Sequence, residues 1–218
     1  MIIGVCGFIG SGKDTVADYL QNFHEFRRDS FASTLKDAVA SVFGWDRELL
    51  EGHTKEARAW REQVDAWWAN RLLMPELTPR SILQLWGTEV CRRSFHDDIW
   101  IASLENKLRK SRDNIVISDC RFPNEIQAIK AQGGKVFWVQ RGELPDWYHL
   151  AVDANKGDLI AQEMLKQISI HVSETAWVGT EFDGIIDNNG TIEQLYGQIS
   201  DLVQEIPDAT EDPTFAPQ

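Results

Sequence analysis

The chain has 218 residues, a formal net charge of −12 at pH 7 and 43% hydrophobic residues. This length and composition predict one large globular domain that can bury a substantial core. The excess of acidic residues argues against a nucleic-acid or membrane partner, because such surfaces need a basic footprint. A locally basic cleft for small anionic ligands remains compatible with this charge.

The three cysteines, Cys6, Cys91 and Cys120, have no metal-ligand spacing and lie among apolar residues, as in a reduced intracellular protein. The apolar start "MIIGVCGFIG" has no basic segment before it and runs directly into a glycine loop. We therefore expect a buried strand there, not a signal peptide or a membrane span, and a cytoplasmic protein.

The elements expected in the first half of the chain are a strand, a glycine loop, two helices and a helical insertion. The strand covers residues 2–6, the first helix carries Val16, Tyr19, Leu20 and Phe23, and the second helix spans 33–43. Residues 46–110 are rich in helix-forming residues, and Pro75 and Pro79 interrupt them, so we expect a helical insertion in this region.

The second half alternates strands and helices. We expect strands at 114–120, 135–141 and 182–187, helices at 123–134 and 158–168, and a last helix to about residue 206 that begins with a Thr191–Gln194 capping box. Residues 207–218 have the composition of a flexible acidic tail. Strands that alternate with helices indicate a three-layer α/β fold with a mainly parallel sheet.

The clearest motif is "GFIGSGKDT", which places Gly7, Gly12 and Lys13 in the spacing of a phosphate-binding loop. An apolar strand precedes it and an amphipathic helix follows, which a chance glycine-rich turn would not require. In such a loop backbone N–H groups and the helix N-terminus hold phosphate oxygens, and the lysine reaches the terminal phosphates. We expect Gly10, Ser11, Gly12, Lys13, Asp14 and Thr15 to contact the phosphates of ATP.

Asp14 stands where a Ser or Thr usually follows the lysine of this loop. In one branch of phosphate-loop kinases, which includes the adenylate kinases, the hydroxyl comes one place later, and Thr15 fits that position. Asp14 could then lie near the water shell of Mg²⁺, or it could simply be an anion in the first turn of a helix. The spacing does not separate these two interpretations.

Several segments together resemble one family. "SGKDT", "FASTLKDAVA", "TPRSILQLWGTEV", "DDIWI", "ISDCRFPNE" and "IIDNNGTIEQL" recur in the order found in the bacteriophage deoxynucleoside monophosphate kinases, over residues 1 to about 206. These enzymes transfer the γ-phosphoryl group of ATP to a deoxynucleoside monophosphate (dNMP). The resemblance implies this activity, a substrate-binding role for the helical insertion at 46–110, and ATP and Mg²⁺ as cofactors. It also implies the cytoplasm of a host cell as the location and a homodimer as one possible assembly.

The resemblance also implies roles for individual residues. Lys13, Asp14, Arg80, Asp119 and Arg121 would be catalytic, and Thr15 with Asp14, the latter through water, would hold the metal. The dNMP would contact Lys36, Arg80, Gln84, Gly87, Thr88, Trp100, Asp119, Arg121 and Glu125, while Asn188 and Gly190 would approach the adenine. Arg61, Arg92, Arg93 and Arg141 are additional candidates. His171 and Glu174 are too few to bind a metal, so we expect a structural role for them.

Two other classes compete with this interpretation. "NKGD" at 155–158 imitates the guanine-binding tetrapeptide of GTPase switches, although the only Asp-x-x-Gly, "DNNG" at 187–190, follows it in the wrong order. A kinase of another small metabolite, such as dephospho-coenzyme A, would share the loop, but its hydroxyl acceptor would need a catalytic base.

Overall fold

The computed structural model describes residues 1–206 and divides into two compact units. Among the described residues, the first unit contains 1–30 and 108–206, and the second contains Phe31–Lys107. The second unit thus also includes residues 31–45, which precede the helical insertion expected at 46–110. Helix α2 (Ser33–Phe43) belongs to this unit because its buried residues pack with Trp45 and Leu50. The predicted acidic tail, 207–218, lies outside the described residues.

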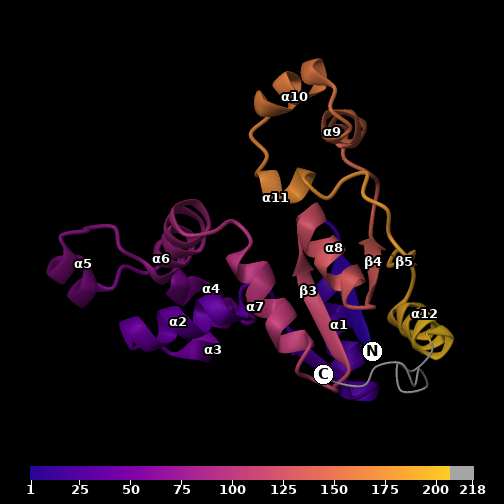
Figure 1. The fold of residues 1–218 in the computed structure, drawn as a ribbon, viewed down its shortest axis with the longest axis horizontal. Helices are drawn as coiled ribbons and strands as arrows, with labels where there is room; N and C mark the ends of the chain where they lie inside the picture. The colour runs from indigo at the N-terminus through magenta and orange to yellow at the C-terminus, as the bar shows by residue number, and fades with distance from the viewer. Residues whose placement is uncertain (207–218) are drawn as a thin grey trace. The chain divides into compact units, whose positions relative to one another are not determined.

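The first unit is built on a parallel five-stranded sheet (Figure 1). Its strands are β1 (Ile2–Cys6), β2 (Arg27–Asp29), β3 (Ile115–Cys120), β4 (Lys135–Gln140) and β5 (Gly184–Asp187), in the order β2-β3-β1-β4-β5. Every neighbouring pair is parallel, which confirms the predicted α/β class. Strand β2 was not expected, because its three residues, Arg-Arg-Asp, contain no apolar residue to mark a buried strand.

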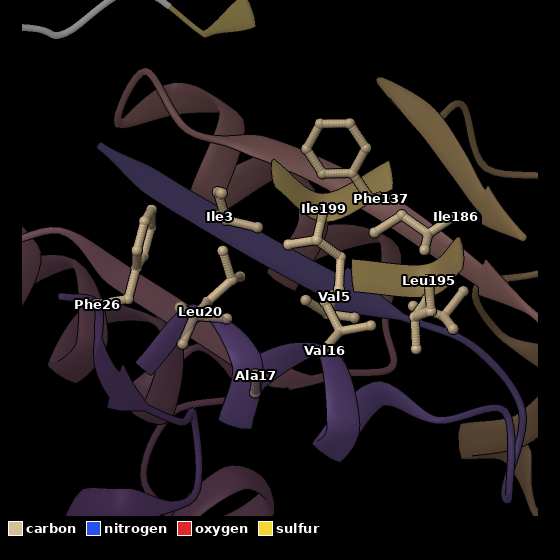
Figure 2. Close-up of a cluster of buried hydrophobic side chains, with 12 residues drawn as sticks. Ile3, Val5, Val16, Ala17, Leu20, Phe26, Phe137, Ile186, Leu195 and Ile199 are labelled. Carbon is tan, nitrogen blue, oxygen red and sulfur yellow. The ribbon is translucent and has the colours of Figure 1, made fainter. Parts of the chain in front are cut away.

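Helices cover both faces of this sheet, as predicted. α1 (Lys13–Phe23) and α12 (Ile192–Glu205) pack on one face, and α8 (Pro123–Ala131) packs on the other. The unit also contains α9 (Tyr148–Asn155), α10 (Leu159–Lys166) and α11 (Val172–Thr175). Because side chains of a strand alternate between faces, Ile3 and Val5 of β1 join the core formed with α1 and α12 (Figure 2). Gly4 faces the other side, where a Cβ would lie 2.8 Å from Ile129 of α8.

Capping residues set where several of these helices begin. Thr191 and Gln194 form the predicted capping box of α12, with the Thr191 N–H donating to Gln194 Oε1 at 2.8 Å. The helix expected at 158–168 is the shorter α10, and a second helix, α9, lies before it in the chain. Asp158 caps α10 by accepting from the N–H groups of Ile160 and Ala161. Within residues 1–206 no helix is long and apolar enough to cross a membrane.

The second unit is helical around an aromatic core. Besides α2 it contains α3 (Arg47–Glu51), α4 (Lys55–Arg61), α5 (Ala66–Leu72), α6 (Pro79–Gln84), the π-helix η1 (Leu85–Arg93) and α7 (Ile99–Leu108). Phe43 and Trp45 stack with their ring centroids 4.4 Å apart, and the Trp45 indole N–H donates to Asp65 at 2.8 Å. Asp65 also caps the N-terminus of α5, so its carboxylate connects this helix to the aromatic core through Trp45. Aromatic packing of this kind holds together a unit that has no sheet.

Candidate active site

The phosphate loop follows the central strand of the sheet. β1 pairs with β3 on one side and with β4 on the other, and α1 begins at Lys13. Because all the strands are parallel, their carboxyl ends lie at the same edge, where open α/β sheets bind ligands. The residues that follow β3 and β5 therefore come to the loop, although they are far from it in sequence.

Two glycines of the loop, Gly10 and Gly12, adopt left-handed backbone conformations, with φ of +80° and +100°. Gly12 is also the N-cap of α1 and lies against the side chain of Asn188. The Ser11 side chain is buried, and its hydroxyl oxygen has no hydrogen-bond partner among the described residues. A buried hydroxyl without a partner is costly, and a phosphate oxygen bound in this loop could supply one.

Lys13 lies over its own loop. Its ammonium group donates to the carbonyl oxygens of Gly7 at 2.7 Å and Phe8 at 2.8 Å. Burial lowers the pKa of Lys13, and the nearby positive charge of Arg121 lowers it further. Two cations that are held close together favour an anionic ligand, and phosphate is such a ligand.

Asp14 pairs with a residue that the sequence gave no reason to select. Its Oδ1 accepts a charged hydrogen bond from Arg28 of β2. The same guanidinium binds Asp18 at 3.0 Å and Ser118 Oγ at 2.8 and 3.0 Å, so it is fixed from three sides. Asp14 is thus held by an ion pair at the start of α1. Whether it also serves magnesium-bound water stays a prediction.

The donor atoms near the loop fit a magnesium ion that is held mainly by substrate phosphates. Thr15 offers a hydroxyl oxygen in the first turn of α1. Among the described residues there is no group of three or more His, Cys, Asp or Glu side chains that could hold a metal. Mg²⁺ usually keeps several waters and binds few protein oxygens, so one hydroxyl with a nearby carboxylate suits it.

The segment after β3 carries Asp119, Arg121 and Glu125. Asp119 is partly buried at the end of the strand. Glu125 is only 3% exposed, and its Oε2 accepts from the backbone N–H groups of Arg121 at 2.9 Å and Phe122 at 3.2 Å. The expected dNMP contact does not fit Glu125, because its carboxylate is buried against the chain that carries Arg121. It is better described as a positioning residue for that arginine.

Glu174 of α11 binds both Arg121 and the phosphate loop. Arg121 Nη1 donates to Glu174 Oε1 at 2.8 Å, and the backbone N–H of Ile9 donates to Glu174 Oε2 at 3.2 Å. His171 has the structural role expected of it, since it is the N-cap of α11 and accepts from the Ser173 N–H at 3.2 Å. The sequence showed Glu174 only as half of a pair with His171.

Asn188, directly after β5, also reaches the loop. Its side-chain amide donates to the carbonyl oxygen of Ser11 at 2.8 Å, and its backbone N–H donates to Gln140 at 2.8 Å. Asn188 therefore supports the loop backbone, and Gly190 lies in the exposed turn that follows. An adenine contact at either residue stays a prediction.

The tetrapeptide "NKGD" has structural duties that do not suit guanine recognition. The Asn155 amide donates to the carbonyl oxygens of Thr175 and Val178, each at 2.8 Å. Asp158 caps α10, as described above. Since both side chains are used inside the first unit, the resemblance to a GTPase motif is a coincidence of sequence.

In the second unit, the charged candidates are already paired. Lys36 binds Glu51 at 2.8 Å, and Arg80 binds Glu62 at 3.3 Å in an exposed ion pair. Gln84 and Thr88, from α6 and η1, are exposed and could contact a ligand. Their segment includes nine residues of π-helix, a conformation that is found often at functional sites.

Trp100 does not fit the expected role of a contact to the nucleoside. Its ring is 8% exposed within the core of the second unit, and its indole N–H donates to the carbonyl oxygen of Gly87 at 2.9 Å. Gly87 is buried too, and a Cβ there would lie 2.8 Å from Leu35. Both residues fix the position of η1 and are not available as a surface for stacking.

Arg61 is the additional arginine that stands out. Its guanidinium lies against Gly52, and its Nε is buried without a hydrogen-bond partner among the described residues. Burial lowers the pKa of Arg61, and the positive charge of Arg80 lowers it further. An anion bound beside these two arginines would offset both effects.

Comparisons with known proteins agree with the sequence motifs. The chain is 29% identical over 217 residues to a protein of Acanthamoeba polyphaga mimivirus assigned as a deoxynucleotide monophosphate kinase, covering 93% of this chain and 96% of that protein. It is 28% identical over 179 residues to the deoxynucleoside-5′-monophosphate kinase of Escherichia phage T5, covering 60% of this chain and 72% of that enzyme. No family model matches the chain.

Similar solved structures include TT1252 from Thermus thermophilus, at 18% identity and a TM-score of 0.46, covering 95% of this chain and 98% of that chain. Another is the dephospho-CoA kinase from Campylobacter jejuni, at 15% identity and a TM-score of 0.44, covering 94% and 96% of the two chains. The phosphate loop on the central strand and the two viral relatives agree with the resemblance of this chain to the deoxynucleoside monophosphate kinases.

Proposed function

We propose that the protein transfers the γ-phosphoryl group of ATP to a deoxynucleoside monophosphate and releases ADP and a deoxynucleoside diphosphate for DNA synthesis. The observation that carries this proposal is the phosphate loop, with Lys13 and Arg121 close to each other at the carboxyl edge of a parallel sheet. Two viral relatives assigned as kinases of this type support the choice of acceptor.

The chemistry asks little of the protein beyond charge and position. The acceptor is a phosphate oxygen that is already ionised at neutral pH, because its second pKa is about 6. No catalytic base is therefore needed, in contrast to a kinase that acts on a hydroxyl group. The protein must instead neutralise and align two polyanions, and its cationic side chains can do this.

The phosphate loop would bind ATP, the phosphoryl donor. Lys13 would exchange its present bonds to the Gly7 and Phe8 carbonyl oxygens for the terminal phosphates of ATP. Arg121 can bind phosphate oxygens with two parallel N–H groups and would stabilise the phosphoryl group during its transfer. Glu125 would hold the backbone of Arg121 in place for this task.

When bound, magnesium would offset the negative charge of the ATP phosphates. Thr15 would supply the direct oxygen ligand, in agreement with the shifted position of its hydroxyl. Asp14 would act on the metal-bound waters through the oxygen that Arg28 does not use, since Arg28 contacts Oδ1. Its ion pair would then orient the carboxylate and not compete with the metal.

The acceptor phosphate would bind to arginines of the second unit. Arg80 is exposed, and its present partner Glu62 is exposed as well, so exchanging that carboxylate for a phosphate costs little. Arg61 would join it, because its Nε has no partner among the described residues. Lys36, Gln84 and Thr88 remain proposed contacts of the dNMP, and Asp119 remains a proposed acidic partner of the substrates.

The direct test is turnover. Purified protein is incubated with ATP, Mg²⁺ and a panel of ribo- and deoxynucleoside monophosphates, and the diphosphate products are separated by chromatography. We expect rapid formation of a diphosphate from at least one deoxynucleotide and slow ATP hydrolysis without an acceptor. If no deoxynucleotide yields a diphosphate, the proposed function is wrong, and acceptor-independent GTP hydrolysis would favour a switch protein.

Lys13→Ala tests the assignment of the donor site. Removing a preorganised charge from a transferring phosphoryl group typically lowers turnover about 10²–10³-fold, so we expect at least this loss. Lys166→Ala is the matched control, because it removes the same charge from an exposed pair with Glu163 on α10. Near-normal turnover of Lys13→Ala would contradict the donor site, whatever the control does.

A further inference from the structure

The Glu174 carboxylate lies where an anionic ligand of the loop would be expected. One oxygen accepts from Arg121 at 2.8 Å, and the other accepts from the Ile9 N–H at 3.2 Å. A backbone N–H of the phosphate loop and an arginine are donors of the kind that phosphate oxygens use. An internal carboxylate therefore has two of the contacts that a bound phosphate would make.

This position of Glu174 is held by its surroundings. Its side chain is 15% exposed, and the adjacent Ser173 hydroxyl is bound by Arg121 at 3.2 Å and by His171 Nδ1 at 2.8 Å. Farther along, the buried ring of Trp177 packs on Phe8 of the loop, with centroids 4.6 Å apart. The segment is thus fixed to the loop by polar contacts on one side and by aromatic contacts on the other.

The Ile9 N–H and Arg121 Nη1 already donate to Glu174, so a nucleotide phosphate that approaches these donors must displace the carboxylate or share them with it. Two anions against the same donors repel each other, which favours displacement. We propose that Glu174 is an internal competitor of the nucleotide: its carboxylate occupies the loop in the ligand-free protein, and nucleotide binding displaces it. This inference rests on the proposed function only in that the loop binds phosphates.

The competition predicts that neutralising Glu174 strengthens binding. Glu174→Gln keeps the shape of the side chain but removes its charge, so it weakens the bonds to Arg121 and Ile9. The dissociation constants of ATP and of inorganic pyrophosphate are measured by isothermal titration calorimetry. We expect both ligands to bind about tenfold more tightly to the variant, which corresponds to about 1.4 kcal/mol. Pyrophosphate separates the effect on the loop from any adenine contact.

Two controls make the result specific. Glu163→Gln changes the net charge equally on exposed α10, so its affinities should match those of the unmodified protein. Glu174→Asp keeps the charge but shortens the side chain by one methylene group, so that it reaches the Ile9 N–H less well and should also bind pyrophosphate more tightly. Circular dichroism and thermal unfolding confirm that each variant is folded.

Weaker pyrophosphate binding by Glu174→Gln would overturn the inference because Glu174 would then support the bound phosphate, and unchanged binding would overturn it because the carboxylate would then not compete. The proposed function is judged separately, by turnover of the unmodified protein. Tighter pyrophosphate binding by the variant would support the inference even if no deoxynucleotide were phosphorylated.

Discussion

Gly12 is the position where one added methyl group tests the loop geometry most directly. Its φ is +100°, and a Cβ there would lie 2.3 Å from the side-chain nitrogen of Asn188. Gly12→Ala therefore imposes a left-handed conformation on an L-residue, at a cost of about 1–2 kcal/mol. It also displaces the Asn188 amide from the Ser11 carbonyl oxygen, and losing that hydrogen bond with the accompanying strain adds about 2 kcal/mol.

Gly10→Ala is the matched control for this prediction. Its φ of +80° is also left-handed, but a Cβ there would meet nothing within 4 Å. Both variants carry the conformational cost, so their difference reports the contact with Asn188. In a chain of this size about 1 kcal/mol shifts the melting temperature by about 2–4 °C, so Gly12→Ala should melt about 4–8 °C below Gly10→Ala.

The assay is differential scanning calorimetry of five proteins: the unmodified chain, the two single glycine variants, Asn188→Ala alone, and Gly12→Ala combined with Asn188→Ala. Removing the Asn188 amide should abolish the additional cost, so that adding Gly12→Ala to Asn188→Ala costs only as much as Gly10→Ala does. Equal melting temperatures for Gly10→Ala and Gly12→Ala would refute the reasoning, since the contact between Asn188 and the loop would then have no energetic weight.

Two further predictions concern residues that position others. Glu125→Ala leaves the backbone N–H groups of Arg121 and Phe122 without an acceptor, so it should lower the free energy of unfolding by about 2–3 kcal/mol and lower kcat more than it raises KM for ATP. Glu125→Gln keeps an acceptor and should retain most of the turnover. A kcat that Glu125→Ala leaves unaffected would contradict a positioning role. Burial alone would raise the pKa of Glu51, but Lys36 and Arg47 outweigh it and hold the pKa below its usual value of 4.5. A carboxyl group of this kind stabilises the fold above pH 4.5 and loses that contribution as the pH falls through its folded pKa. Glu51→Gln should therefore lower the free energy of unfolding, measured in urea, by about 2 kcal/mol at pH 7. Its difference from the unmodified protein should shrink below about pH 4.5. A difference that does not depend on pH would show that the ion pairs are not its cause.

Local patterns in the sequence predicted much of the first unit. The apolar run before "GFIGSGK" and the capping box at Thr191 each act on neighbouring residues, so the strand β1 and the helix α12 could be located from sequence. The loop and Lys13 were found in the same way, because glycine spacing determines backbone conformation within a few residues. The family resemblance rested on the order of such local motifs.

Contacts between distant residues could not be predicted in this way. β2 consists of charged residues and is a strand only because β3 is beside it, and Arg28 therefore meets Asp14 without any local signal. The start of the helical unit at Phe31, the burial of Trp100 and the buried position of Glu125 likewise depend on packing partners elsewhere in the chain.

The sequence by itself determined that this protein carries a phosphate loop, because such a loop is specified by adjacent glycines, a lysine and the elements on either side. Only the tertiary structure decided which residues surround that loop. A parallel sheet brings the ends of strands from distant parts of the chain to one edge, and there Arg28, Arg121 and Asn188 meet the loop while Glu174 occupies it. Such encounters follow from the pairing of strands, and no spacing along the chain encodes them.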